Sequence, residues 1–196
     1  GGNRRPAVHD GTVYTPSFSD GLIGYDIETG AQTFSIDTTI FRPLSVTAAP
    51  SGLVVGTDSG LAGVSYEGAT RWQYAPTDLN RDRGAIAVAN GTAYAGFSGD
   101  PNQLVAVDTG DGHEQWRTKT APESTPQFAP PSVADGIVYF PTEDQGIAAV
   151  DATDGHVRWR FSRTRERFFG PWSPTALVDE TLYFVGNGHL YALEEA

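Results

Sequence analysis

The chain has 196 residues, 13 Lys and Arg against 24 Asp and Glu, a formal net charge of −11, and neither Cys nor Met. This composition excludes disulfides, thiolate nucleophiles and Cys-based metal sites, and it does not favour nucleic acid as a partner, because phosphate binding needs positive potential. No apolar run approaches the roughly 18 residues of a membrane span, and the absence of Met predicts a processed or excised segment.

The basic residues are almost all Arg, with Lys119 as the single Lys. Strong acidity with scarce Lys favours a halophilic host, because a dense carboxylate surface stays hydrated in salt. An acidic secreted protein from a GC-rich genome is the alternative. We therefore predict an extracellular or cell-surface location, in a halophilic archaeon under the first interpretation.

Five repeats of one pattern follow one another along the chain. We name the expected strands of each repeat A, B, C and D in chain order. Strand B follows a turn pair, and strand C ends near an acidic residue or a small turn. Strand D, where the repeat has one, contains an aromatic residue. The first repeat has Asp10-Gly11-Thr12-Val13-Tyr14, then Leu22-Ile23-Gly24-Tyr25-Asp26, then Phe34. The second, which is the most degenerate, has 51–55, 61–65 and Trp72.

The third and fourth repeats agree closely with each other. The third has 90–94, 104–108 and Trp116, and the fourth has 135–139, 147–151 and Trp159. The fifth has 179–183 and 190–194 and stops before a strand D. The turns at positions 11, 52, 91, 136 and 180 are separated by 41, 39, 45 and 44 residues, close to the roughly 40–50 residues of a propeller blade.

The segment before each turn supplies a strand A, at 45–49, 85–89, 132–134 and 174–178 in the later repeats. No stretch has sustained helical periodicity. We predict an all-β chain that forms one domain over 1–196, a β-propeller of about five blades, each a four-stranded antiparallel sheet. The repeats extend over about 4–36, 44–74, 84–118, 130–161 and 172–196.

Two residue positions recur in these strands. Strand C has a small residue at one position (Gly24, Gly63, Ala106, Ala149 and Ala192), which we expect to let a neighbouring sheet approach closely. The aromatic residues of strand D are expected to pack between blades, because a forty-residue blade cannot offset its own conformational entropy without neighbours.

The chain resembles the pyrroloquinoline-quinone-type (PQQ-like) repeat of β-propellers over about residues 8–196. The motifs that carry this resemblance are the turn and strand Asp135-Gly136-Ile137-Val138-Tyr139, the strand Leu104-Val105-Ala106-Val107-Asp108 and the strand that contains Trp. Similar repeats occur in quinoprotein alcohol dehydrogenases, in the BamB-type scaffold of outer-membrane assembly, in sensor domains of kinases and in haloarchaeal surface proteins. The family's propellers commonly have more than five blades. We therefore expect part of a larger propeller, completed by additional blades or by self-association, with a self-contained five-blade ring as the alternative.

Quinoprotein dehydrogenases have a vicinal Cys pair against the cofactor, bind calcium through carboxylate and amide side chains, and use an Asp base. This chain has no Cys and no local motif to which those roles could be transferred. His113 and His156 hold equivalent positions in adjacent repeats, so repetition explains them better than a metal site. We predict that the protein is not an enzyme and has no metal or cofactor, with PQQ and calcium as the cofactors of the alternative.

Strand directions divide the charges between two rims. The A–B and C–D turns form one rim, which carries eleven acidic residues and no Lys or Arg, as expected of Asx-type turns. The B–C and D–A loops form the other rim, which has ten acids, nine bases and more aromatic residues. Arg beside aromatic residues is typical of interface hot spots. The candidate binding residues are Arg42, Arg81, Arg83, Arg163, Arg165, Arg167 and Phe168.

The competing interpretation is that these Arg residues neutralise nearby acids in solvated salt bridges and that the aromatic residues belong to the core. The sequence thus predicts a non-catalytic binding or scaffold propeller that recognises a protein or small ligand through its loop rim. A PQQ-dependent dehydrogenase, or a fragment of one, is the first alternative. The extracellular sensor domain of a surface receptor is the second.

Overall fold

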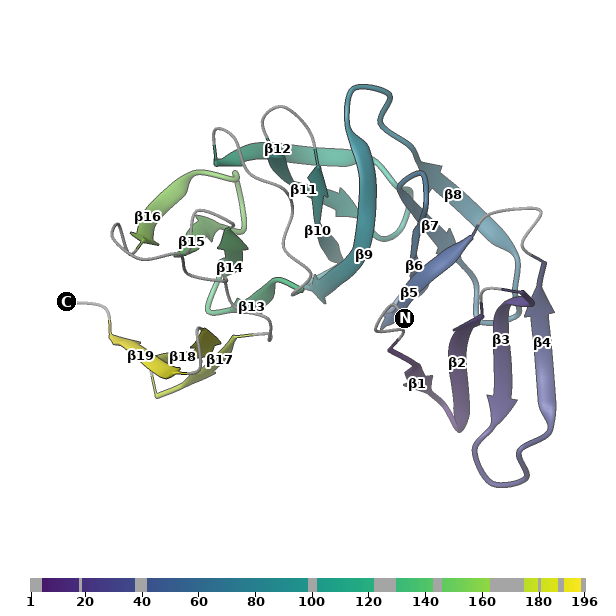
Figure 1. Ribbon diagram of the computed structural model, residues 1–196. Coiled ribbons are helices and arrows are strands. Elements are labelled where there is room, and N and C mark those ends of the chain that lie inside the picture. The colour runs from purple at the N-terminus through teal and green to yellow at the C-terminus, as the bar shows by residue number, and fades with distance from the viewer. Residues whose placement is uncertain are drawn as a thin grey trace.

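The computed structural model describes residues 5–17, 19–37, 42–98, 102–121, 130–142, 146–162, 175–179, 181–186 and 189–194. Within these ranges the chain forms five antiparallel sheets, and no helix occurs. The sheets follow one another along an arc in chain order, as Figure 1 shows. The prediction of an all-β chain with about five blade-like sheets is confirmed.

Four sheets have four strands each, and the fifth has three in its described part. The first sheet contains β1 (Ala7–His9), β2 (Thr12–Ser17), β3 (Gly21–Asp26) and β4 (Gln32–Ile36). The second contains β5 (Pro43–Ala49), β6 (Gly52–Thr57), β7 (Leu61–Val64) and β8 (Thr70–Tyr74). The third contains β9 (Asn80–Ala89), β10 (Thr92–Ser98), β11 (Asn102–Asp108) and β12 (Glu114–Ala121).

The fourth sheet contains β13 (Ser132–Ala134), β14 (Ile137–Thr142), β15 (Gly146–Asp151) and β16 (Val157–Ser162). The fifth contains β17 (Ala176–Val178), β18 (Thr181–Gly186) and β19 (His189–Glu194). In the four-stranded sheets, strand A lies on the inner side of the arc and strand D on its outer side (Figure 1). The predicted order of strands A to D within a repeat is therefore the order found in space.

The A–B turns explain the recurring pairs of Asp or Asn with Gly. Asn90 and Gly91 have backbone φ angles of 49° and 78°, and Asp135 and Gly136 have 51° and 73°. Two successive residues with positive φ make the tight hairpin turn whose twist matches that of antiparallel strands. Asn, Asp and Gly tolerate this conformation better than other residues, so the geometry of the hairpin selects them.

The small residue of strand C has a role beyond the one predicted. In the second sheet, Gly63 lies directly opposite Trp72 of strand D, and a Cβ at Gly63 would lie only 2.1 Å from Trp72 Nε1. Gly24 lies opposite Phe34 in the same way. Gly24 and Gly63 therefore make room for the aromatic ring of their own sheet, whereas Ala106 and Ala149 lie in the clusters shared with the next sheet, as expected.

The aromatic residues of strand D also join each sheet to the next. Trp72 Nε1 donates to the carbonyl oxygen of Thr109 at 3.0 Å, and Trp116 Nε1 donates to that of Ala152 at 3.1 Å. Both acceptors lie in the C–D turn of the following sheet, where a Gly also faces the ring. A Cβ at Gly112 would lie 2.7 Å from Trp72, and one at Gly155 would lie 2.6 Å from Trp116.

We call this pair of features, the turn carbonyl and the turn Gly, an aromatic dock. Phe34 contacts the second sheet at the corresponding Gly68, where a Cβ would lie 3.1 Å from its ring. Trp72 and Trp116 are only 8% and 9% exposed. The prediction that these residues pack between blades is confirmed.

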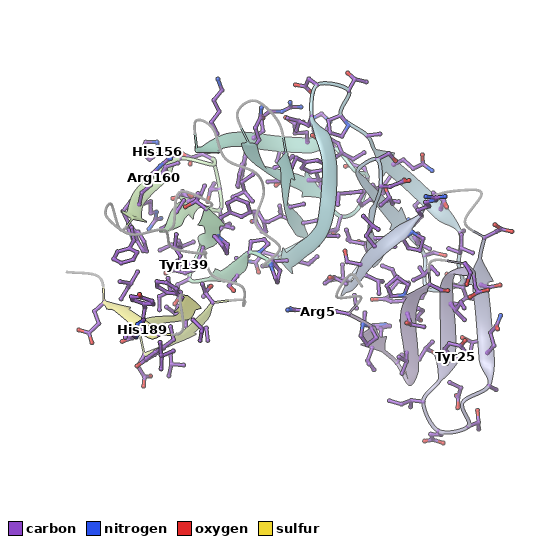
Figure 2. The ribbon with its side chains drawn as sticks, viewed as in Figure 1. Arg5, Tyr25, Tyr139, His156, Arg160 and His189 are labelled. Carbon is purple, nitrogen blue, oxygen red and sulfur yellow. The ribbon has the colours of Figure 1, made fainter. Side chains whose placement is uncertain are left out.

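Four hydrophobic clusters fill the spaces between successive sheets. Each cluster takes residues from one face of two neighbouring sheets, such as Tyr94 and Trp116 with Val138 and Phe140 between the third and fourth. The other face of the fourth sheet contributes Tyr139 to the next cluster, which also contains Leu182 and Phe184 of the fifth sheet. Figure 2 shows Tyr139 on the side of the fourth sheet that faces the fifth.

Burial along the strands reflects whether a sheet has one neighbour or two. Strands β6 and β14 are buried at every position, because residues on both faces meet a neighbouring sheet. In β2 and β19, by contrast, more buried residues alternate with more exposed ones. The first and fifth sheets therefore each have one face that packs on a neighbouring sheet, although Ile23 on the other face of the first sheet is also only 8% exposed.

Candidate functional site

The structure separates the two rims that the sequence predicts. The turn rim consists of the A–B and C–D turns, and the loop rim consists of the B–C and D–A loops. The carboxylates of the turn rim accept backbone hydrogen bonds within their own turns. Asp26 Oδ1 accepts from the amide of Thr29, Asp108 Oδ1 from that of Gly110, and Asp151 Oδ1 from that of Thr153, at 2.7–2.8 Å.

These hydrogen bonds explain the Asp residues of the turn rim. Hydrogen bonds from Thr29 lower the pKa of Asp26, and a hydrogen bond from Arg158 is the largest influence that lowers the pKa of Asp151. Asp111 and Asp154 accept the backbone amides of His113 and His156 at 2.9 and 2.8 Å. These five carboxylates of the turn rim thus stabilise their turns, as predicted for Asx-type turns.

The predicted binding residues have different locations. Arg42 is exposed in the loop before β5. Arg81 and Arg83 lie inside β9, because its pairing with β10 continues past a bulge to Asn80 instead of ending near residue 85. Their assignment to a loop was therefore wrong, and the structure describes only their backbone. Arg163, Arg165, Arg167 and Phe168 lie outside the described residues.

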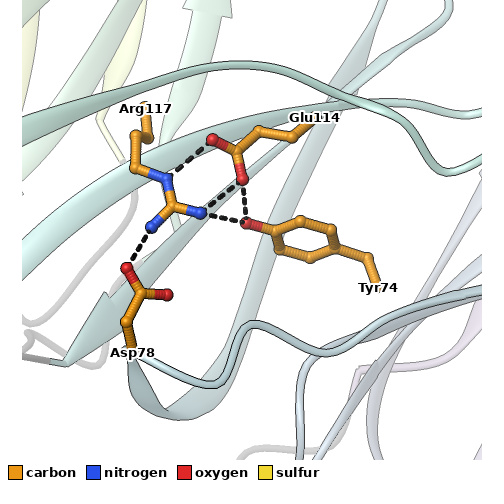
Figure 3. A network of polar contacts seen from close by, with 4 residues as sticks. All are labelled: Tyr74, Asp78, Glu114 and Arg117. Carbon is orange, nitrogen blue, oxygen red and sulfur yellow. Dashed lines mark hydrogen bonds and ion pairs between the residues drawn. The ribbon is translucent and has the colours of Figure 1, made fainter.

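A polar network lies where strand D of the second sheet and its following loop meet strand D of the third (Figure 3). Arg117 on β12 donates from Nε to Glu114 Oε1 and from Nη2 to Glu114 Oε2, both at 2.6 Å. Its Nη1 donates to Asp78 Oδ2 at 2.7 Å. Tyr74 on β8 donates its hydroxyl hydrogen to Glu114 Oε2 at 2.5 Å. We call these four residues the Arg117 clamp.

The electrostatics of the Arg117 clamp favour the charged forms of the Arg and Glu and the neutral form of the Tyr. The guanidinium lowers the pKa of Glu114 and Glu114 raises that of Arg117. Burial, followed by the hydrogen bond to Glu114, raises the pKa of Tyr74. The side chains of Arg117 and Glu114 are 32% and 26% exposed, and that of Asp78 is 63% exposed. The clamp fixes the loop at Asp78, just before β9, against the third sheet.

Sequence reasoning missed this clamp. It gave Glu114 and Arg117 no role, although they form a bidentate pair three residues apart. Tyr74 lies forty residues from Glu114, about one repeat away. No sequence signal marked it, and only the structure shows that Thr118, which corresponds to Tyr74, also reaches the following sheet through a hydrogen bond to the carbonyl of Gly155.

No three His, Asp or Glu side chains gather into a possible metal site in the part of the chain that the structure describes. The same part contains no helix that could cross a membrane. Its chemistry is that of hydrogen-bonded turns, inter-sheet docks and one charged clamp, which can position loops for contact with a partner.

Comparison with known proteins identifies the family and the fold. The family model described as outer membrane protein assembly factor BamB matches residues 57–196. No curated protein sequence matches the chain. BamB from Moraxella catarrhalis is 22% identical with a TM-score of 0.72, and the match covers 92% of this chain and 57% of that one.

Two quinohemoprotein alcohol dehydrogenases have the same fold, each at 17% identity. The enzyme ADHIIG from Pseudomonas putida HK5 has a TM-score of 0.76, with coverage of 97% of this chain and 40% of that one. The Comamonas testosteroni enzyme has a TM-score of 0.82, with coverage of 99% and 41%. The present chain thus spans between two fifths and three fifths of these solved structures, and at such identities the likeness shows the fold.

Proposed function

Since this chain belongs to the PQQ-like repeat family described as outer membrane protein assembly factor BamB, we propose that it is a non-catalytic scaffold propeller that binds another protein through its loop rim. The observation that carries the proposal is the contrast between the rims. Five described acids of the turn rim accept hydrogen bonds within their own turns: Asp26, Asp108, Asp111, Asp151 and Asp154. On the loop rim, by contrast, Arg42 is exposed, and Arg81 and Arg83 lie at the start of β9, just after the loop that the Arg117 clamp positions.

Arg42 is exposed before β5, and Arg81 and Arg83 follow the clamped loop. Guanidinium groups pair with carboxylates in bidentate geometry and contact aromatic rings, so they suit a partner segment that carries acidic and apolar residues. Arg163, Arg165, Arg167 and Phe168 extend the proposed surface by sequence position. We place the protein outside the cytoplasm, by analogy with the outer-membrane factor of its family, and the halophilic host remains a prediction.

The test is binding of the 196-residue protein to an array of short peptides that vary in acidic and apolar content. We expect acidic, aromatic-containing peptides to bind, and the triple variant Arg42→Ala, Arg81→Ala, Arg83→Ala to lose at least about tenfold in affinity, or ~1.4 kcal/mol. Arg158→Ala is the matched control, because Arg158 pairs with Asp151 next to the turn rim. Equal binding by the triple variant, with an unchanged unfolding midpoint, would refute the assignment of this rim.

A quinone-dependent dehydrogenase is the second candidate, supported by the TM-scores of the two alcohol dehydrogenases. Calcium needs several oxygen ligands around one ion, but the described residues bring no three Asp, Glu or His side chains together. We therefore rank this candidate second, and no step through the quinone is derived. Reduction of a redox dye by the protein with PQQ, calcium and an alcohol would replace the scaffold proposal. A receptor's sensor domain would use the same binding surface.

A further inference from the structure

The A–B turn of the third sheet carries a motif that the scaffold function does not use. Asn90-Gly91-Thr92 is the only Asn-x-Ser or Asn-x-Thr sequence among the 196 residues. Such a motif, when x is not Pro, is the acceptor of N-linked sugars in exported proteins. Asn90 is exposed at the tip of the hairpin that joins β9 to β10.

The turn itself does not require Asn at this position. The corresponding turns of the first, fourth and fifth sheets have Asp10, Asp135 and Asp179, with φ angles of 42°, 51° and 46°, and Asn90 has 49°. Asp and Asn both tolerate this left-handed backbone. Position 90 therefore differs from the other three in one chemical group, a side-chain amide nitrogen in place of a carboxylate oxygen. Only the amide nitrogen can carry an N-linked sugar.

The surroundings of Asn90 leave room for a glycan. A Cβ on the adjacent Gly91 meets no atom within 4 Å. Asn90 takes no part in the hydrophobic clusters between sheets, and its hairpin belongs to the turn rim, at the opposite end of the strands from the loop rim. A sugar attached here extends into solvent and covers neither the loop rim nor the contacts between sheets.

Folding hides the other part of the motif. Thr92 is only 7% exposed, and its hydroxyl donates to Gln115 Oε1 on β12 at 3.1 Å. The carbonyl of Gly91 accepts from the amide and the hydroxyl of Thr109, at 2.8 and 2.9 Å. Because the motif requires a hydroxyl at its third position, the transferase must reach that hydroxyl. The folded third sheet withholds it.

We propose that Asn90 accepts an N-linked glycan before the third sheet has folded. The donor is an oligosaccharide linked through phosphate to a lipid. Asn90 Nδ2 forms a bond to the anomeric carbon of the sugar while the bond from that carbon to the phosphate oxygen breaks. The lipid phosphate leaves with this electron pair, and the amide loses one proton to a base of the transferase. The proposal requires export of the chain and is independent of the loop rim as a recognition surface.

Secretion of the 196-residue chain from eukaryotic cells, behind a cleavable leader, tests the acceptor because this route supplies both donor and transferase. We expect one glycan that peptide N-glycosidase removes, and none on Asn90→Asp. This variant is the matched control, because Asp occupies three corresponding turns, and its Tm should equal that of the unglycosylated chain. Thr92→Ser keeps the motif and should still be glycosylated.

Secretion of the folded chain without a glycan would overturn the proposal. This result would count against Asn90 and not against export, because the cells provide the compartment. A glycan sensitive to peptide N-glycosidase that persists on Asn90→Asp would equally overturn it, since the sugar would then lie elsewhere.

The order of events has a separate test, on chain purified from bacteria without a glycan. Microsomal membranes should glycosylate a peptide of residues 86–96 at least about tenfold faster than the folded chain, because the chain must first open its third sheet. Equal rates would show that the transferase reaches Thr92 in the folded sheet, and would overturn the requirement that transfer precede folding.

Discussion

Gly112 and Gly91 have the same backbone φ of 78°, yet they differ in what a side chain would meet. A Cβ on Gly91 has no neighbour within 4 Å, whereas one on Gly112 would lie 2.7 Å from the ring of Trp72. Alanine at either position costs about 1–2 kcal/mol, because an L residue disfavours left-handed backbone.

We predict that Gly112→Ala lowers the free energy of unfolding by about 1–3 kcal/mol more than Gly91→Ala, since it also overpacks the aromatic dock. Urea denaturation of the two variants measures the difference. Equal losses would mean that the turn moves away from Trp72 at little cost, and that the dock contributes little to the inter-sheet contact.

For single residues, the sequence identifies the positions that contribute to packing better than it predicts the contacts that each of them makes. The recurrence of Trp and of the turn Gly indicates packing, and the structure confirms it for Trp72 and Trp116. The role of Gly63 could not be obtained in this way, because it depends on the bulge that brings Trp72 opposite Gly63 between β7 and β8. A shift of one residue in the register of two paired strands does not change the spacing of the repeats in the sequence, so it cannot be predicted from that spacing.

The Arg117 clamp joins two elements, β8 with its following loop and β12, and its strength depends on pH. Arg117 holds the pKa of Glu114 below its usual range. A carboxyl with a lowered pKa stabilises the fold above its ordinary pKa of about 4.3, and this stabilisation is lost as pH falls through the lower value of the folded chain.

We therefore expect Glu114→Gln to destabilise the protein at pH 7 by about 0.5–1 kcal/mol, a modest value because the pair is partly exposed. The difference should shrink as the pH is lowered from 5 to about 3. Urea midpoints of the two proteins across this range measure it. Glu28→Gln, on an exposed turn after β3, is the control. A constant difference across the range would show that the charge of Glu114 is not responsible.

Strand order could be predicted for every sheet, and strand limits for many. The exception at β9 matters most for the candidate site, because it places Arg81 and Arg83 in a strand. Their segment is polar and charged, without the apolar alternation that marks a strand. Its pairing is imposed by β10, which continues to Ser98, and tertiary contacts of this kind override local preference.

The molecule as a whole is a series of sheets in which each hydrophobic cluster belongs to two neighbours. Its internal sheets have both faces covered, and its end sheets have one. In such arrays the end units open more readily than the internal ones.

Hydrogen exchange measured by mass spectrometry should therefore rank the sheets by their number of neighbours. We expect amides of β6, β10 and β14 to exchange most slowly, and those of β1 and β17 most rapidly. Each pair of central strands has the same antiparallel pairing as in the end sheets, so pairing alone would predict no such order. Uniform protection along the chain would contradict it.

Because each hydrophobic cluster joins two sheets that are consecutive in the chain, the sheets can fold in order during synthesis. The cluster between the first and second sheets uses residues from Tyr14 to Val64, and the next uses residues from Ala49 to Val107. At a synthesis rate of about 5–20 residues per second, each further repeat of forty residues takes roughly 2–8 s to emerge from the ribosome. Each new sheet can therefore pack on the exposed apolar face of the sheet before it, so folding can begin before the C-terminal repeats have been synthesised.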